Sequence, residues 1–162
     1  MNSADKIYTE ETLLPVLQQW REENQKIVFT NGCFDLLHLG HVDYLEKARA
    51  LGDKLVLGLN TDRSIRCLKG EERPLQDEMA RARIMASLLF VDAVVLFDEE
   101  TPYNLIKLVQ PDILVKGDDY APENIVGYDI VKAKGGEVKT VSLVKGYSTS
   151  NIVAKIKRTV KN

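Results

Sequence analysis

The sequence predicts an α/β protein with a Rossmann-like, doubly wound parallel sheet of five strands and helices on both faces. Two observations predict it. Short runs of β-branched and aliphatic residues alternate along the chain with longer segments in which apolar residues recur at helical spacing. Glycine, asparagine or proline interrupts the chain between many of these segments. Because strands that alternate with helices form right-handed βαβ units, we expect the sheet to be parallel and buried on both faces.

The first half of the chain predicts two helices and two strands in alternation. Over residues 11–23, four apolar side chains are expected on one helical face: Leu13, Leu14, Leu17 and Trp20. Residues 26–30 form a β-branched and aromatic run that an Asn-Gly pair ends, as is typical of a buried strand. Apolar spacing then predicts a helix over residues 42–51, followed by Gly52, and a second strand over residues 54–59.

A polar stretch over residues 60–72 follows the second strand and is long for a connection between a strand and a helix. We expect it to be a functional loop. The remaining elements alternate after it, with helices expected over residues 77–90, 101–109, 123–134 and 149–161 and strands over residues 93–97, 113–115 and 138–141. Thr101 and Pro102 are expected as the N-cap and the first residue of their helix.

The length of 162 residues fits one domain, residues 1–162, in which residues 1–25 form an N-terminal helical extension. The 22 Lys and Arg residues are balanced by 24 Asp and Glu residues, for a formal net charge of −2. This balance excludes a strongly basic nucleic-acid-binding protein, so a site for an anion must be built from a few placed donors. A hydrophobic content of 44% with 28% charged residues argues against disorder.

The chain has two cysteines, Cys33 and Cys67, and no CxxC pair, which argues against a disulfide framework and against a zinc or redox centre. No segment near the N-terminus has the form of a signal peptide, and no uncharged apolar run approaches about 18 residues. We therefore expect a cytoplasmic protein that binds neither a membrane nor nucleic acid.

Ligands of doubly wound sheets bind beyond the carboxyl ends of the strands, so the residues that follow each strand are candidates. After the first strand, the two histidines of the chain, His38 and His41, bracket Gly40 where a helix begins. A helix N-terminus suits phosphate, and imidazoles can donate to phosphate oxygens. The simpler alternative is that both histidines only cap or pack the helix start. Asp35 could belong to the site or be a plain turn or N-cap residue, and Cys33 could belong to the site or be a small residue in a tight loop.

Three further strand ends carry candidate donors. Lys69 lies beside a glycine in the polar stretch, where it could reach an anion or simply be solvated. After the fourth strand, Lys116 could meet a phosphate and the pair Asp118 and Asp119 could hold sugar hydroxyls or magnesium, unless the segment is a plain turn. The last helix opens with more hydroxyls than a cap needs: Ser148, Thr149 and Ser150. Two donor-rich helix starts that face one crevice would suit a triphosphate.

Four segments of the chain resemble the HxGH nucleotidyltransferase superfamily, which is cytidylyltransferase-like: TNGCFDLLHLGHVDYL, LKGEERP, DILVKGDDY and GYSTSNI. Within it, the chain most resembles the adenylyltransferases of ADP-heptose synthesis, over residues 7–157. The resemblance implies an enzyme that condenses ATP with a heptose 1-phosphate to give ADP-heptose and pyrophosphate, for lipopolysaccharide or surface-glycan precursors. It also implies that Mg²⁺ arrives on the ATP phosphates, with few or no metal ligands from the protein.

By the same resemblance, His38, His41 and Lys69 are the catalytic residues, and Lys69 and Arg81 hold the phosphate of the attacking sugar. A larger set is expected to surround the nucleotide: Thr30, Asn31, Gly32, Cys33, Phe34, His38, Gly40, His41, Lys116, Gly117, Asp118, Tyr147, Ser148, Thr149 and Ser150. The resemblance further implies a homodimer or larger homo-oligomer, and a sugar kinase that is a separate protein.

The chain departs from the family pattern in two places. Ser150 stands where the heptose enzymes usually have threonine, a change that keeps the hydroxyl. Cytidylyltransferases carry RTEGIS before their hydroxyls, whereas this chain has LVKGYS, so the arginine is missing and CTP is disfavoured. The alternatives are a cytidylyltransferase that acts on glycerol phosphate or ethanolamine phosphate, and a nucleotide-binding sensor that does no chemistry.

Overall fold

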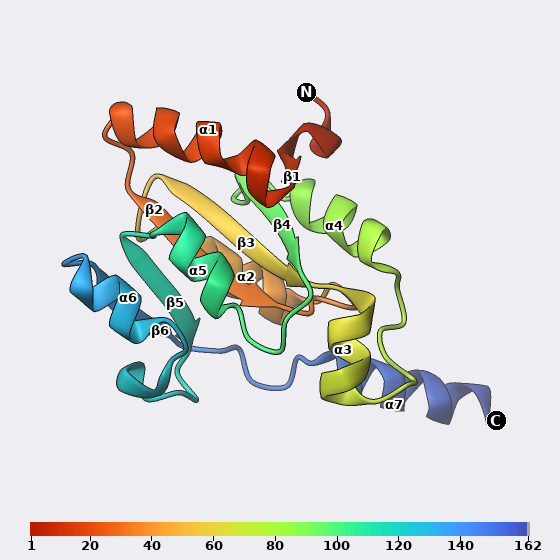
Figure 1. Cartoon of the computed structure of the whole chain (residues 1–162). Helices are drawn as coiled ribbons and strands as arrows, with labels where there is room; N and C mark the ends of the chain where they lie inside the picture. The colour runs from red at the N-terminus through yellow and green to blue at the C-terminus, as the bar shows by residue number, and fades with distance from the viewer. Residues whose placement is uncertain (162) are drawn as a thin grey trace.

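The computed structural model describes residues 1–161 and contains a six-stranded parallel sheet flanked by helices (Figure 1). The order of strands across the sheet is β1-β4-β3-β2-β5-β6. The strands are β1 Ile7–Tyr8, β2 Ile27–Gly32, β3 Lys54–Asn60, β4 Ala93–Phe97, β5 Ile113–Gly117 and β6 Glu137–Val141. The predicted doubly wound parallel sheet is therefore confirmed, whereas the predicted number of five strands is wrong.

The additional strand, β1, lies at the edge of the sheet and pairs with β4 through Ile7 and Tyr8. Two residues are too few to show the alternation by which a strand is recognised in a sequence. Just before this strand, the Lys6 ammonium donates hydrogen bonds to the carbonyls of Leu88, at 3.3 Å, and Val91, at 2.8 Å. The N-terminal extension is therefore part of the sheet and not only a helix beside it.

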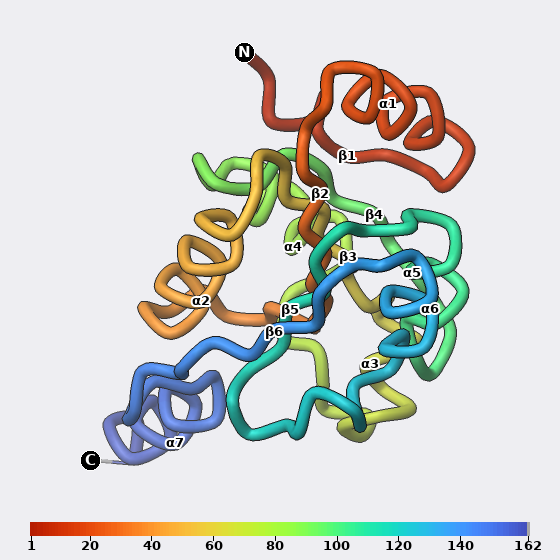
Figure 2. The backbone as a smooth tube through the Cα atoms, turned by 90° about the vertical axis from the view of Figure 1, so that its left-hand side faces the viewer, coloured from red at the N-terminus to blue at the C-terminus, as the bar shows by residue number. Residues whose placement is uncertain are grey.

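Seven α-helices are seen within the described residues. They are α1 Glu10–Glu22, α2 Leu39–Arg49, α3 Asp62–Lys69, α4 Glu78–Ala86, α5 Tyr103–Val109, α6 Tyr128–Ala133 and α7 Thr149–Val160. Five of them, α1, α2, α4, α5 and α6, cover the two faces of the sheet. Figure 2 shows α2 on one side of the sheet and α5 and α6 on the other.

The two layers follow from the alternation of side chains along each buried strand. On β2, Phe29 points into a core that α1, α5 and α6 cover, and Val28 points into a second core that α2 and α4 cover. Because both faces are apolar, the strands are near-continuous hydrophobic runs, which is why the sequence reveals them clearly. On α1, Leu13, Leu17 and Trp20 are buried as expected, whereas Leu14 is 49% exposed, so its predicted place on that face is wrong.

Two predicted segments differ from the structure. The polar stretch over residues 60–72 contains the helix α3, which buries only Ser64 and Ile65 and therefore lacks an apolar stripe. The helix predicted over residues 123–134 divides into a 3₁₀ turn, Pro122–Asn124, and α6. Between them Gly127 adopts a φ of +90°, which ends one piece before the next begins.

Helix boundaries shift at two other places. The helix α5 begins at Tyr103 with Pro102 as its N-cap, so Thr101 does not cap it. The helix α4 has Asp77 as its N-cap and ends at Ala86, four residues before the predicted end at residue 90. Residue 162, the last of the predicted domain, lies outside the described residues.

The path of the chain creates a crevice beside β2. This strand pairs in parallel with β3 on one side and with β5 on the other. The chain runs from β2 to β3 and β4, and then returns to the far side of β2 to form β5 and β6. The connections that leave β2 and β5 therefore diverge at the carboxyl edge, which is the place where doubly wound sheets bind ligands.

The last helix, α7, projects from the body of the molecule (Figures 1 and 2) and has no buried residue. Its first turn lies at the carboxyl edge of the sheet, against the loop after β2, where the Thr149 hydroxyl faces the Leu36 carbonyl at 3.5 Å. Within residues 1–161, no helix has the length and apolar character needed to cross a membrane.

We expect Leu17→Ala to lower the free energy of unfolding by about 2–5 kcal/mol, because it opens a cavity in a fully buried part of the core. Leu14→Ala, on the same helix but half exposed, should cost less than about 1 kcal/mol. Urea denaturation of both variants measures this. Equal losses would show that α1 is not packed on the sheet as described.

Candidate active site

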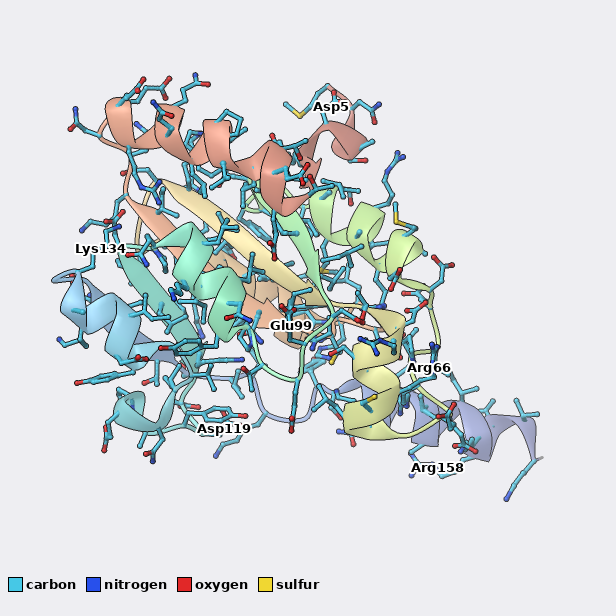
Figure 3. All side chains as sticks on the ribbon, in the orientation of Figure 1. Asp5, Arg66, Glu99, Asp119, Lys134 and Arg158 are labelled. Atoms are coloured by element: carbon cyan, nitrogen blue, oxygen red, sulfur yellow. The ribbon has the colours of Figure 1, made fainter. Side chains whose placement is uncertain are left out.

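A cavity of about 710 Å³ opens at the carboxyl edge of the sheet, beside β2 and β5. It has a floor and two walls. The floor is the connection from β2 into α2, which carries both histidines. One wall comes from α3 and the segment that follows it, and the other comes from the segments after β5 and β6 together with the start of α7. Figure 3 shows Asp119, after β5, and Arg66, on α3, at the two sides of this edge.

The structure brings most of the predicted site residues to this cavity. Those that line it are Gly32, Cys33, Phe34, His38, Gly40, His41, Lys69, Lys116, Gly117, Tyr147, Ser148, Thr149 and Ser150. Four predicted residues do not line it: Thr30, Asn31, Arg81 and Asp118.

The two histidines of the floor lie against each other at the N-terminus of α2. His38 is the N-cap residue, but its side chain makes no capping hydrogen bond. The two rings stack with their centroids 3.7 Å apart and their planes 27° from parallel. Both Nδ1 atoms are buried and have no hydrogen-bond partner among the described residues. An unpaired buried polar atom costs about 1–3 kcal/mol, so the fold holds the two rings in this position at a cost in stability.

Burial keeps this pair uncharged at neutral pH. It lowers the pKa of His38, and it lowers the pKa of His41 to about 4, with further contributions from His38 and from the Lys69 ammonium. A neutral imidazole has one N–H donor and one acceptor nitrogen, so each ring can donate one hydrogen bond to an oxyanion. A bound polyanion would favour the protonated form and raise both pKa values again.

Close packing determines the positions of the two rings. A Cβ atom at Gly40 would lie 2.9 Å from the Nδ1 and Cε1 atoms of His38, so a side chain there would displace the imidazole. Glycine at position 40 therefore leaves room for the His38 ring, and it also allows a ligand to approach the backbone. Phe34 has a φ of +45°, which is uncommon outside glycine, and its ring meets the edge of His41 at 5.0 Å. A Cβ atom at Gly32 would in turn strike the Phe34 ring at 2.7 Å.

The wall after β5 carries a largely buried cation. Burial lowers the pKa of Lys116, whose ammonium lies 5.9 Å from the centroid of the Tyr120 ring. The close approach of Asp119 explains Gly117, because a Cβ atom there would lie 2.7 Å from the carboxylate. Asp119 lines the cavity, whereas Asp118 is exposed and lies outside it. The sequence indicated both acidic residues and the family resemblance named Asp118, whereas Asp119 is the one that lines the cavity.

The start of α7 presents hydroxyls on the same wall. Ser148 is the N-cap, and its Oγ atom accepts a hydrogen bond from the Asn151 amide at 3.0 Å. One of the three hydroxyls thus caps the helix, as expected from the sequence. Thr149 and Ser150 follow it in the first turn and also line the cavity.

The opposite wall begins with Lys69, the last residue of α3, and continues with Arg73. Asp35 holds this wall to the floor, because its carboxylate accepts hydrogen bonds from the amides of Leu75, at 2.8 Å, and Gln76, at 2.9 Å. The sequence left open whether Asp35 belongs to the site or is a plain turn or N-cap residue. It lines the cavity and anchors a segment about forty residues away in the chain.

Arg81 lies beneath the cavity and not in it. Its side chain is fully buried and donates four hydrogen bonds. The acceptors are the carbonyls of Cys33, Asn60 and Gln76 and the carboxylate of Asp62. A guanidinium has five N–H groups, so almost all of its donor capacity is used. This geometry contradicts the expectation that Arg81 binds the phosphate of a substrate.

Thr30 and Asn31 also lie outside the cavity. The Thr30 hydroxyl is buried, lies 2.7 Å from the Tyr44 hydroxyl and donates to the Val115 carbonyl at 3.0 Å. Burial raises the pKa of Tyr44 to about 12. These contacts join β2, α2 and β5 behind the site. The Thr30 side chain is therefore part of the support and does not line the cavity.

Several lining residues were missed by sequence reasoning: Tyr44, Ile65, Arg73, Tyr120, Leu143 and Val144. For the apolar ones the sequence contains no signal beyond their place in an element. Arg73 does have a signal, because it lies in the LKGEERP segment four residues after Lys69. Among residues 1–161, no cluster of three or more His, Cys, Asp or Glu side chains could hold a metal ion.

The family model described as cytidylyltransferase-like matches residues 29–156. The chain belongs to the cytidylyltransferase-like family. This confirms the resemblance that the four sequence motifs indicated, and the matched residues include the whole floor and both walls of the cavity.

Curated relatives of this cytidylyltransferase-like chain include two described as bifunctional protein HldE. The protein from Methylobacillus flagellatus is 55% identical over 153 residues, which are 94% of this chain and 31% of the relative. The protein from Syntrophotalea carbinolica is 58% identical over 151 residues, 93% of this chain and 31% of the relative. The chain thus spans about a third of the length of these relatives.

Solved structures agree with the fold. A lipopolysaccharide core biosynthesis protein from Thermoplasma volcanium matches with a TM-score of 0.60 and 30% identity, over 76% of this chain and 99% of that one. A pantoate-beta-alanine ligase from Francisella tularensis matches with a TM-score of 0.61 over 96% of this chain and 79% of that one. At 16% identity, the ligase supports the fold alone.

We expect Arg81→Met to lower the free energy of unfolding by about 3 kcal/mol or more, because it leaves buried carbonyls and a carboxylate without their partner. Arg83→Met is the matched control, since Arg83 lies on the same helix, is exposed and makes one hydrogen bond, to Ser3. Chemical denaturation compares the two. Similar small losses in both would contradict the role of Arg81 as a support.

His41 should make the stability of the protein depend on pH. Its pKa in the folded state, about 4, is below that of an unfolded histidine, about 6.5, so the folded state binds fewer protons between these values. The contribution of His41 is therefore complete above pH 6.5 and is lost as the pH falls towards 4. We expect the free energy of unfolding, measured by urea denaturation, to fall more between pH 7.5 and pH 5.0 in the wild type than in His41→Gln. An equal fall in both proteins would contradict the burial of a neutral His41.

Proposed function

We propose that this chain is a nucleotidyltransferase that joins ATP to a heptose 1-phosphate and releases ADP-heptose and pyrophosphate. The observation that carries the proposal is the convergence of two helix N-termini and a stacked pair of histidines on one cavity. Free N-terminal amides and imidazole N–H groups are donors that suit a chain of phosphates. Family membership and the HldE relatives support the same reaction class.

The chemistry needs little beyond placement and charge stabilisation. An oxygen of the sugar phosphate attacks the α-phosphorus of ATP, the bond from that phosphorus to the α,β-bridging oxygen breaks, and pyrophosphate leaves with the electron pair. The attacking oxygen is already anionic, so no strong base has to remove a proton. The enzyme has to hold two polyanions in line and to stabilise the charge that develops on the phosphoryl group.

Each part of the cavity has a place in this scheme. His38 and His41, on the floor, donate to oxygens of the phosphate that is attacked. The first turn of α7 receives the outer phosphates through its amides and its hydroxyls. Lys116 lies on the same wall, and Lys69 lies opposite, where it meets the phosphate of the sugar. The stacked imidazoles start neutral, so they can strengthen their hydrogen bonds as negative charge grows.

Mg²⁺ is proposed to enter with ATP, bound to its phosphates. Oxygen donors suit this ion, and the cavity wall offers the Asp119 carboxylate and the hydroxyls at the start of α7. When bound, the ion neutralises phosphate charge and orients the leaving group. The carboxylate of Asp35 is less suited, because both of its oxygens already accept backbone amides.

The source of the sugar phosphate and the assembly of the protein are proposals as well. A heptose 1-phosphate requires a reaction that places a phosphate on the sugar, which we expect from a sugar kinase. A separate kinase protein stays a prediction, because the bifunctional relatives extend far beyond the matched region. A homodimer or larger homo-oligomer likewise stays a prediction.

The test is a screen for pyrophosphate release with heptose, hexose and polyol phosphates against each of the four nucleoside triphosphates. We expect turnover with ATP and a heptose 1-phosphate. His41→Ala should lose about 10²–10³-fold in turnover with a melting temperature close to that of the wild type, whereas Lys107→Ala, exposed on α5, should match the wild type. Binding of ATP without pyrophosphate from any acceptor would indicate a sensor, and turnover with CTP would indicate the cytidylyltransferase alternative.

A further inference from the structure

Two arginines lie next to the wall that carries Lys69, and their environments are opposite. Arg81 is fully buried and its guanidinium donates four hydrogen bonds to protein acceptors. Arg73 lines the cavity, and its side chain is 21% exposed. Among residues 1–161, the Arg73 guanidinium donates no hydrogen bond, although the amide of the same residue donates to the Gly70 carbonyl at 3.1 Å. The N–H donors of Arg81 are thus almost all bound to protein acceptors, whereas those of Arg73 are not.

Asp35 is the charged group nearest to Arg73, and it does not occupy those donors. The Nη1 atom of Arg73 lies 3.6 Å from Oδ2 of Asp35, which is beyond hydrogen-bond distance. Both oxygens of Asp35 already accept backbone amides, those of Leu75 and Gln76. The carboxylate therefore forms an ion pair with Arg73 but takes none of its N–H donors, so the guanidinium can bind a second anion.

The backbone of this wall turns Arg73 towards the cavity. The helix α3 ends at Lys69, and Gly70 follows with a φ of +96°, a conformation that residues with side chains rarely adopt. The turn that follows reverses the chain, and the two amides bound to Asp35 hold the next residues against the floor. Lys69 and Arg73 therefore face the same cavity, with the histidine pair between them and the wall formed by α7.

We propose that Arg73 binds the phosphate of the acceptor, together with Lys69, and is the guanidinium that the sequence assigned to Arg81. This inference rests on the proposed function, since it names the residue that meets the second substrate. A planar guanidinium binds two oxygens of a phosphate at once, which leaves the third oxygen to attack. The acceptor phosphate loses one negative charge when it becomes part of the diphosphate of the product, so the same contact is weaker in the product.

The position of Arg73 also predicts which substrate is affected by its loss. The nucleotide is proposed to lie towards Lys116 and the start of α7, and Arg73 is on the opposite wall. Replacement of Arg73 should therefore weaken the binding of the sugar phosphate and leave the binding of ATP nearly unchanged. A residue that only supported the fold would change both, together with the melting temperature.

The test compares Arg73→Gln, Arg73→Lys and Arg66→Gln. Arg66 is a matched control, because it lies on α3, is exposed and does not line the cavity. We expect Arg73→Gln to raise the KM for the sugar phosphate about 10- to 100-fold, with the Kd for ATP changed less than about threefold. Arg73→Lys should recover part of the loss, and Arg66→Gln should behave as the wild type.

A binding measurement separates this inference from the proposed function. Calorimetric titration of inorganic phosphate into protein saturated with α,β-methylene-ATP needs no turnover. Weaker phosphate binding in Arg73→Gln, with that in Arg66→Gln unchanged, supports the role of Arg73 even if no sugar phosphate gives pyrophosphate. Equal phosphate binding in Arg73→Gln and the wild type overturns it, and so does a parallel loss of ATP and phosphate binding.

Discussion

One buried guanidinium holds the carboxyl edge of the sheet together. Arg81, on α4, joins the floor of the cavity at Cys33, the end of β3 at Asn60 and the segment before α4 at Gln76, and it also pairs with Asp62 at the start of α3. Carbonyls at the ends of buried strands need hydrogen-bond donors, and water is excluded from this place. A single side chain with a planar fork of donors meets this need from below and leaves the cavity above it open.

Asp35 supports the same edge of the sheet from the side of the cavity. It supplies acceptors to two amides of the segment that carries Arg73, whereas Arg81 supplies donors to carbonyls on either side. The two residues do not depend on any ligand, since all their main partners belong to the chain. The histidine pair on the floor, by contrast, has buried Nδ1 atoms without partners. The site thus combines a fully hydrogen-bonded support with a pair of rings whose hydrogen bonding is incomplete.

The sequence predicted the parts of the structure that follow from hydrophobic pattern and from position. The buried strands and the helices that cover them are long apolar runs or stripes, and the residues after each strand are known to meet at one edge. It did not predict β1, which is two residues long, or α3, which buries only Ser64 and Ile65. Nor could it separate Arg73 from Arg81, because the difference lies in which acceptors surround each guanidinium, and those acceptors come from distant segments.

The location of charge explains how a protein of net charge −2 offers a cavity to polyanions. The cations Lys69, Arg73 and Lys116 and two helix N-termini lie at one edge, and the histidines between them are held neutral by burial. The two walls come from separate stretches of the chain, on opposite sides of β2. On the proposed assignment of the two walls, substitutions in the wall after β3 change acceptor choice during evolution while the wall proposed for the nucleotide stays intact. A fold divided in this way allows new acceptors to be acquired one segment at a time.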